Sequence, residues 1–167
     1  MTYAPTCLER NMILIDEDFL PQAIALITSA KERIDIATFK AEITPKPRGL
    51  RLKQFFQTLF DKRDQGVQVN FLINWNDERR VVPMTNLSAI RDLKQHKINV
   101  KILKSNRCCH AKILLVDKDR AIIGSHNLSV RSCHNNFEIS YLFDDPCSIT
   151  RLSTIYDRTL QDAQPAH

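Results

Sequence analysis

The sequence predicts an α/β fold in which a mixed β-sheet is flanked by helices on both faces. Short apolar runs alternate with longer segments of helical periodicity, the pattern of a sheet covered by helices. Two of these runs, 113–116 and 121–123, are joined by a short polar turn that predicts an antiparallel hairpin, so the sheet is mixed. With 167 residues, 43% of them hydrophobic, we expect a single domain over 1–167, loosely ordered at 1–11 and 161–167.

The expected elements follow from the apolar periodicity and from the residues that interrupt it. Apolar runs predict strands at 12–15, 33–39, 67–73, 98–103, 113–116, 121–123 and 137–143. Helical spacing predicts helices over 18–27, 50–63, 86–96 and 146–160, with Asn86 and either Asp144 or Asp145 as N-caps. The segments 40–49 and 74–85 are expected to be loops, and 128–135 a short connection.

Polar side chains flank the predicted hairpin on both sides. His110 and Lys112 precede its first strand, and Ser125 and Asn127 follow its second. If the turn centres on residues 118 and 119, Lys112 lies opposite Ser125 and His110 lies opposite Asn127. Because side chains two residues apart on a strand share a face, this register would gather the four on one patch.

The chemistry of this patch suits an oxyanion. Lys112 supplies a cation, while Ser125 and Asn127 supply neutral donors. Gly124 lacks a Cβ, so its backbone can approach a ligand closely. His110 can act as a nucleophile or as an acid–base group near neutral pH. The alternative is a half-buried hairpin with one histidine and one lysine at its mouth.

The pattern His110-x-Lys112-x4-Asp117-x6-Gly124-Ser125-x-Asn127 resembles the signature of the phospholipase D superfamily at every defined position. Over about 18–160 the chain is similar to the small, single-motif bacterial nucleases of that superfamily. The resemblance implies a phospholipase D-like fold and phosphodiester cleavage through a phosphohistidine. One motif histidine would attack phosphorus while a second protonates the leaving oxygen and then activates water.

This sequence contains one His-x-Lys motif, whereas the superfamily chemistry requires two. The resemblance therefore implies a two-fold homodimer that sets two copies of His110 across one site. Lys112 and Asn127 of both subunits would neutralise the phosphoryl oxygens. We accordingly expect no metal and no other cofactor.

Two acidic residues complete the candidate site. Glu138 is a lone carboxylate in an apolar run, and the resemblance implies that it bonds His110 and holds the required tautomer. The alternative is that Glu138 lies on an edge strand and its side chain faces water. Asp117 belongs to the motif but lies an odd number of residues from His110. On an extended strand it would face away from the patch, so we expect it to bind backbone or a cation at the turn.

The net charge of +5 is concentrated before the motif. Between residues 91 and 112 the basic residues are Arg91, Lys94, Lys97, Lys101, Lys104, Arg107 and Lys112, against one acid, Asp92. This excess suits a polyanion, and we expect Lys101, Lys104, Arg107 and the Gly124 backbone to bind substrate. The alternative is a solvated helix face followed by a loop.

The composition limits the kinds of binding partner and the cellular compartment that we expect for this protein. The sequence has neither an apolar run long enough to cross a membrane nor an export signal, so we expect a cytoplasmic protein without stable membrane insertion. The cysteines are expected to be reduced, and Cys108, Cys109, Cys133 and His134 are not expected to bind zinc, because vicinal cysteines on a strand point to opposite faces. The leading function is a metal-independent endonuclease acting on DNA or RNA. The alternatives are a phospholipid phosphodiesterase or phosphatidyl transferase, and a catalytically silent scaffold.

Overall fold

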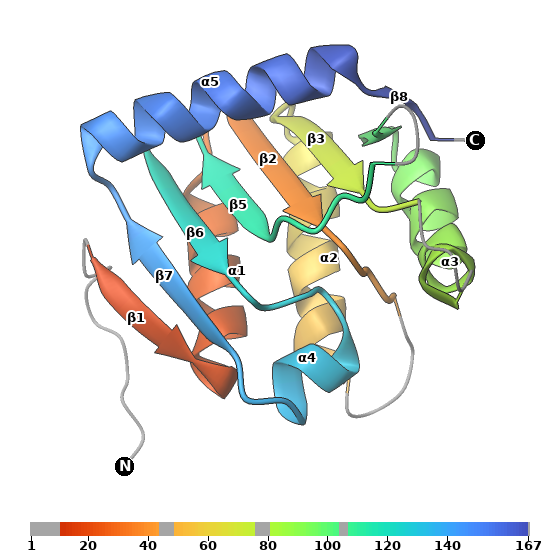
Figure 1. The fold of residues 1–167 in the computed structure, drawn as a ribbon, viewed down its shortest axis with the longest axis horizontal. Helices are drawn as coiled ribbons and strands as arrows, with labels where there is room; N and C mark the ends of the chain where they lie inside the picture. Colours follow the sequence, from red (N-terminus) through yellow and green to blue (C-terminus); the bar gives the residue numbers. More distant parts are fainter. Residues whose placement is uncertain (1–10, 44–48, 76–80, 104–106, 167) are drawn as a thin grey trace.

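The computed structural model describes residues 11–43, 49–75, 81–103 and 107–166, with the backbone alone for 81–83. These residues form an eight-stranded mixed sheet (Figure 1). The strands lie in the order β1 (Met12–Ile15), β7 (Ile139–Phe143), β6 (Arg120–Gly124), β5 (Ile113–Val116), β2 (Arg33–Thr38), β3 (Gln68–Ile73), β4 (Asn99–Ile102) and β8 (Gln164–Pro165). The strands β2, β3 and β4 are parallel, and the other neighbouring pairs are antiparallel.

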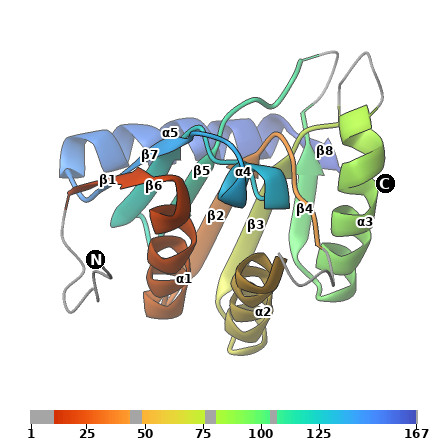
Figure 2. The same ribbon diagram turned by 90° about the horizontal axis from the view of Figure 1, so that it is seen from below.

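Helices cover both faces of this sheet (Figure 2). On one face lie α1 (Phe19–Ser29), α2 (Leu50–Asp64) and α3 (Val81–Gln95), whereas α5 (Pro146–Asp162) crosses the other. A single 3-10 turn, η1 (Asp16–Asp18), leads into α1, and the short helix α4 (Val130–His134) lies between β6 and β7 in the chain. The predicted fold class is therefore confirmed.

The apolar residues segregate to the two sides of the sheet as strand alternation requires. The larger core lies between the sheet and α1, α2 and α3, and includes the fully buried Phe55, Phe56 and Phe71. Smaller clusters lie under α5, around Leu115 and Tyr156. Alternate residues of the central strands pack into the cores on opposite faces of the sheet, and for this reason these strands are apolar almost throughout.

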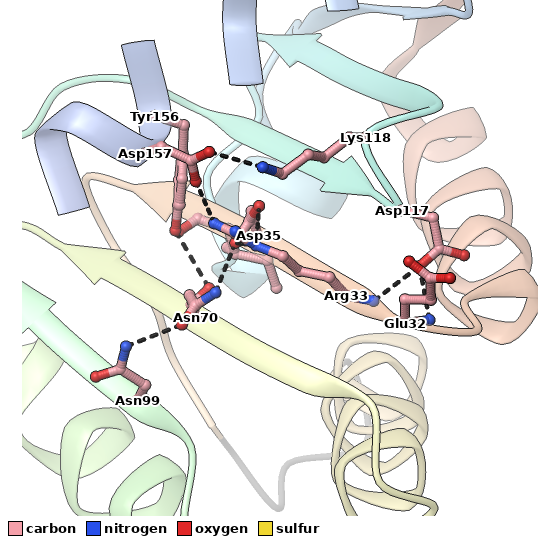
Figure 3. A network of polar contacts seen from close by, with 10 residues as sticks. Glu32, Arg33, Asp35, Asn70, Asn99, Asp117, Lys118, Tyr156 and Asp157 are labelled. Carbon is pink, nitrogen blue, oxygen red and sulfur yellow. Dashed lines mark hydrogen bonds and ion pairs between the residues drawn. The ribbon is translucent and has the colours of Figure 1, made fainter. Parts of the chain in front are cut away.

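A partly buried polar network joins α5 to the centre of the sheet (Figure 3). Arg33 donates to Asp35 at 2.8 Å and to Asp157 of α5 at 2.6 Å, and Asn70 donates to Asp35 at 2.8 Å. The Tyr156 hydroxyl donates to the β2 backbone at 2.8 Å. Burial raises the pKa of Asp35 despite the hydrogen bonds that it accepts from Arg33 and Asn70.

Several predictions about the elements were wrong. Residues 130–134 of the expected connection form α4, and residues 81–85 of the expected loop form the start of α3. The third long helix begins at Val81, so Asn86 lies inside α3 and is not its N-cap. The segment 161–166 is not frayed, because α5 continues to Asp162 and β8 then pairs with β4. The Ala166 amide also donates to the Val100 carbonyl at 3.0 Å, and backbone bonds of this kind hold a terminus in place. The prediction for residues 1–10 lies outside the described residues.

Candidate active site

Five of the predicted catalytic residues lie at one end of the strands, where β2 and β6 end and where β5 and β7 begin, and we call this end the site edge (Figure 1). These residues are His110, Lys112, Ser125, Asn127 and Glu138. The strand directions bring these four ends together. β5 runs antiparallel to β2, β6 runs antiparallel to β5, and β7 runs antiparallel to β6. The motif segments 107–112 and 125–127 therefore emerge at the edge where the chain also leaves β2.

His110 and Lys112 form a close pair at this edge. The Lys112 ammonium is 3.2 Å from Nδ1 and 3.4 Å from Nε2 of His110, and it donates to the His110 carbonyl at 2.7 Å. The Phe39 ring, just beyond β2, packs beside both, 4.9 Å from the imidazole centroid and 5.5 Å from the ammonium. His110 nevertheless remains exposed, so an incoming phosphodiester can reach it.

The charge of this pair favours a neutral imidazole. Burial and the neighbouring Lys112 ammonium both lower the pKa of His110. Burial also lowers the pKa of Lys112, although the Glu138 carboxylate opposes this effect. A neutral imidazole has a free lone pair, which is the form that a nucleophilic histidine requires.

The predicted hairpin register was wrong by one residue. β5 and β6 pair Val116 with Arg120 and Ile113 with Ile123, which continues to Lys112 opposite Gly124. The connection contains three residues, of which Asp117 and Lys118 adopt left-handed φ values of 51° and 54°. The backbone conformation of the turn, which the sequence does not display, decided this register.

Asn127 and Ser125 are held in place by a chain of hydrogen bonds. The Asn127 side-chain oxygen accepts from the Lys40 amide at 3.1 Å, and the Asn127 amide donates to Ser132 at 2.8 Å. Ser132 in turn donates to Glu138 at 2.8 Å, and the Ser125 hydroxyl donates to the other oxygen of the same carboxylate. Because Lys40 directly follows Phe39, these contacts connect Asn127 to the His110 pair.

Within the described residues of one protomer Glu138 makes no hydrogen bond to His110, so a bond between these two side chains across a homodimer stays a prediction. The Glu138 carboxylate instead accepts from Ser125, Ser132 and Asn136. Burial raises the pKa of Glu138, but these hydrogen bonds outweigh burial and hold it below its usual value. Glu138 therefore acts within this chain as an ionised anchor for the loop that carries Ser125 and Asn127.

Two buried asparagines position the site, and neither was predicted from the sequence to belong to it. Asn86 accepts from the Ala41 amide at 2.9 Å and donates to the carbonyls of Phe39 at 3.0 Å and Asn74 at 2.7 Å. The Asn74 side chain accepts from the Cys109 amide at 3.0 Å, directly before His110. An asparagine among the apolar positions of α3 was the available signal, because a buried amide requires partners.

Asp117 has the structural geometry expected of it. Its carboxylate accepts the backbone amides of Lys31 at 2.8 Å, Glu32 at 2.9 Å and Arg33 at 2.8 Å. Burial raises the pKa of Asp117, but these three bonds lower it further, below its ordinary value. Asp117 thus joins the hairpin turn to the start of β2 (Figure 3). This turn follows the end of β5, whereas Lys112 precedes the start of the same strand, so Asp117 lies at the opposite end of the strands from the site.

The predicted substrate-binding residues are only partly available to a ligand. The Lys101 ammonium donates to the Leu160 carbonyl at 2.9 Å and thereby supports α5 instead. Arg107 is exposed, and Lys104 lies outside the described residues. Gly124 has a packing role, because a Cβ there would collide with Ser140 and with the Ile139 carbonyl of β7.

Within 11–43, 49–75, 81–103 and 107–166, the structure contains no group of three or more His, Cys, Asp or Glu residues arranged to hold a metal ion. In the same ranges no helix is both long enough and apolar enough to cross a membrane.

Comparison with known proteins places this geometry in a family. Residues 23–160 match the family model described as "Cardiolipin synthase, PLD-like domain". Curated relatives include a cardiolipin synthase of Alkalihalophilus pseudofirmus, 30% identical over 133 residues, and cardiolipin synthase 2 of Bacillus cereus, 29% identical over 144 residues. These alignments cover 79% and 86% of this chain, but 24% and 26% of the relatives. The chain thus spans about a quarter of their length.

Two solved structures have the same fold over almost their whole length. NucT from Helicobacter pylori has a TM-score of 0.75 and 18% identity, with 94% of this chain and 99% of that chain covered. Nuc from Salmonella typhimurium, described as a phospholipase D family member, has a TM-score of 0.77 and 16% identity, with 94% and 97% covered. The chain therefore belongs to the phospholipase D superfamily, whose members act on phosphodiester bonds, and within it to the family with the PLD-like domain of cardiolipin synthases.

Proposed function

We propose that this chain is a metal-independent phosphodiesterase that cleaves DNA or RNA as an endonuclease. The observation that carries the proposal is the exposed His110 imidazole beside the Lys112 ammonium. His110 attacks phosphorus, so that an N–P bond forms as the bond to the leaving oxygen breaks. A second imidazolium gives its proton to that oxygen, then takes a proton from water as the water hydrolyses the phosphohistidine. Lys112 and Asn127 stabilise the phosphoryl charge.

The second imidazole comes from a second copy of the chain. His126 is the other histidine beside the motif, but it is only 2% exposed and its ring stacks on Phe19. Its Nδ1 is 2.7 Å from the Ser140 hydroxyl, and its Nε2 is 3.0 Å from the Asp16 carbonyl. Because both ring nitrogens are occupied, His126 cannot exchange protons with a substrate. A homodimer with His110 from both protomers supplies the missing group.

An exposed apolar patch beside the site supports this association. We define the sheet patch as six residues on or next to the strands β1, β6 and β7: Ile13, Ile15, Ile123, Phe137, Ile139 and Tyr141. Five of them are neighbours through the β1–β7 and β6–β7 pairings, and Phe137 is two residues before Ile139. Their exposed fractions range from 39% for Ile123 to 77% for Phe137. Apolar surface of this kind commonly marks an interaction site.

The same patch favours a second candidate function, a phospholipid phosphodiesterase or phosphatidyl transferase. An apolar rim beside a phosphodiester site suits a lipid substrate, and the curated relatives are cardiolipin synthases. The positive net charge of +5 and the resemblance to small single-motif nucleases support a nucleic acid. Only one of these substrates should be turned over efficiently.

The deciding experiment is cleavage in EDTA of labelled single- and double-stranded DNA and RNA, beside vesicles of phosphatidylglycerol. We expect wild-type protein to cleave nucleic acid and His110→Ala to lose at least about a thousand-fold in rate. His96→Ala, which replaces an exposed histidine after α3, is the matched control and should retain activity. Turnover of the lipid alone would establish the second candidate, and activity restored only by magnesium would refute the metal-independent mechanism.

Mixing tests the shared site directly. Wild-type and His110→Ala proteins are allowed to exchange subunits at equal concentrations. If each shared site needs both histidines, the mixture should have about a quarter of the activity of the same total concentration of wild-type protein, because only that fraction of the dimers carries two intact copies. A residual activity of about three quarters would show that one His110 per shared site is sufficient, because that fraction of the dimers carries at least one intact copy.

A further inference from the structure

A polar groove lies beside the candidate active site, and the mechanism above does not use it. The groove has a volume of about 550 Å³ and is lined by Lys40, Glu42, Val130, Arg131, Asn135 and Asn136. One wall is the segment that follows β2, and the other is α4 with the turn after it. A volume of this order is typical of sites for small organic groups, roughly 300–1,000 Å³.

Backbone pairing holds the two walls together. Ala41 and Leu128 form a parallel β-bridge, in which the Glu42 amide donates to the Leu128 carbonyl at 2.8 Å. The Leu128 amide donates in turn to the Lys40 carbonyl at 3.0 Å. The groove is therefore built on a hydrogen-bonded base.

The groove is continuous with the site at two points. The Lys40 amide donates to the Asn127 side chain at 3.1 Å, and Asn136 donates to Glu138 at 2.9 Å. Lys40 also directly follows Phe39, the residue that packs on His110. A ligand in the groove thus lies next to a phosphodiester held by Lys112 and Asn127.

The charges in the groove suit one further anion. Arg131 is exposed and donates its Nε to Asn136 at 3.3 Å, which leaves the two Nη groups of its guanidinium without an acceptor in the described part of the chain. The Lys40 ammonium is the second cation. Two carboxylates face this region: Glu42, which accepts from the Val130 amide at 3.3 Å, and Glu138, whose oxygens already accept three side-chain donors. The groove thus offers two cationic donors, and charge-assisted hydrogen bonds of this kind favour a phosphate ligand.

We propose that this groove binds the phosphate adjacent to the scissile one in a nucleic-acid strand, through Arg131 and Lys40. The proposal rests on the nuclease function above and deepens it by assigning the neighbouring nucleotide a place on the protein. It implies that a strand with a phosphate next to the cleaved bond is preferred over an isolated phosphodiester.

The test compares two substrates in EDTA. Bis(p-nitrophenyl) phosphate has one phosphodiester and no neighbouring phosphate, whereas a labelled oligonucleotide has both. For Arg131→Gln, the loss in kcat/KM on the oligonucleotide should exceed the loss on the small diester by about ten-fold, and the slope of log(kcat/KM) against log[salt] should decrease by about one. Lys40→Gln should act in the same direction. Arg151→Gln, at an exposed position on α5, is the matched control and should change neither ratio nor slope.

Three outcomes would overturn the proposal, and they are distinguishable. Equal losses on both substrates would show that Arg131 acts on the reaction centre or on folding, and not on a neighbouring phosphate. Normal oligonucleotide cleavage by Arg131→Gln and Lys40→Gln would refute only the proposal that the groove binds the adjacent phosphate. The proposed nuclease function would not be affected. Turnover of phosphatidylglycerol vesicles without any cleavage of nucleic acid by the wild type would refute both proposals together.

Discussion

Replacing Gly124 by alanine tests how closely β6 and β7 approach beside the site. A Cβ added at Gly124 would lie 2.5 Å from the Ile139 carbonyl oxygen and closer still to the Oγ and Cα atoms of Ser140. Ordinary van der Waals contact begins at 3.4 Å, so β7 would have to move by about 1 Å. Two of the three obstructing atoms are backbone, and a rotamer change cannot relieve them.

The expected cost follows from these contacts. Inserting a methyl group into packed structure costs about 1–3 kcal/mol, and disturbing one or two hydrogen bonds of the β6–β7 ladder adds about 1 kcal/mol each. We therefore expect Gly124→Ala to lower the free energy of unfolding by about 2–5 kcal/mol. For a chain of this size that corresponds to a fall in Tm of about 4–20 °C. Moving β7 also shifts Glu138, so phosphodiesterase activity should fall well below that of the wild type.

Thermal unfolding by circular dichroism, with urea unfolding beside it, measures the loss. Gly66→Ala is the matched control, because nothing lies within 4 Å of its Cβ position and the cost there comes only from a φ of 94°, about 1–2 kcal/mol. Ser140→Gly in the Gly124→Ala background should not rescue, since the Ser140 Cα and the Ile139 carbonyl remain. The steric reasoning is refuted if the two alanine variants lose the same stability, or if Ser140→Gly restores it.

Three further predictions follow from the contacts of the site. Asn86→Leu keeps the side-chain volume but removes the hydrogen bonds of the Asn86 side chain to three backbone groups, so urea unfolding should show a loss of about 2–5 kcal/mol in the free energy of unfolding. A wild-type midpoint would contradict this role of Asn86. Asp117→Asn should lose about 2–4 kcal/mol because it weakens three amide bonds to a carboxylate, yet it should retain activity in the folded protein; a folded, inactive variant would show that Asp117 acts in catalysis. The His110 ring should titrate in ¹H NMR below the ordinary value of 6.5, so that the neutral form predominates at pH 7. Lys112→Met should raise the pKa of His110 but not restore its ordinary value, because burial is the larger cause of the lowered pKa. An unchanged pKa would contradict the effect assigned to the Lys112 ammonium.

Much of the architecture is visible in local pattern alone. The apolar faces of α2 and α5, Pro146 in the first turn of α5 and the cap by Asp145, which accepts from the Ser148 amide at 2.7 Å, depend on neighbours within a few residues. The motif that contains His110, Lys112 and Asn127 can also be recognised from the sequence, because it is defined by residue types at fixed spacings along the chain. These features could therefore be predicted.

The partners of each side chain depended on residues far away in the sequence. Within the chain Glu138 holds the Ser125–Asn127 loop through hydrogen bonds from Ser125, which follows β6, and from Ser132 of α4. Asn86 clamps Phe39 and Ala41 across more than forty residues, which no periodicity records. The sequence by itself determined the elements, the motif and the chemistry available to it. Only the tertiary structure decided the register and the contacts, because both depend on backbone conformation and on packing between distant segments.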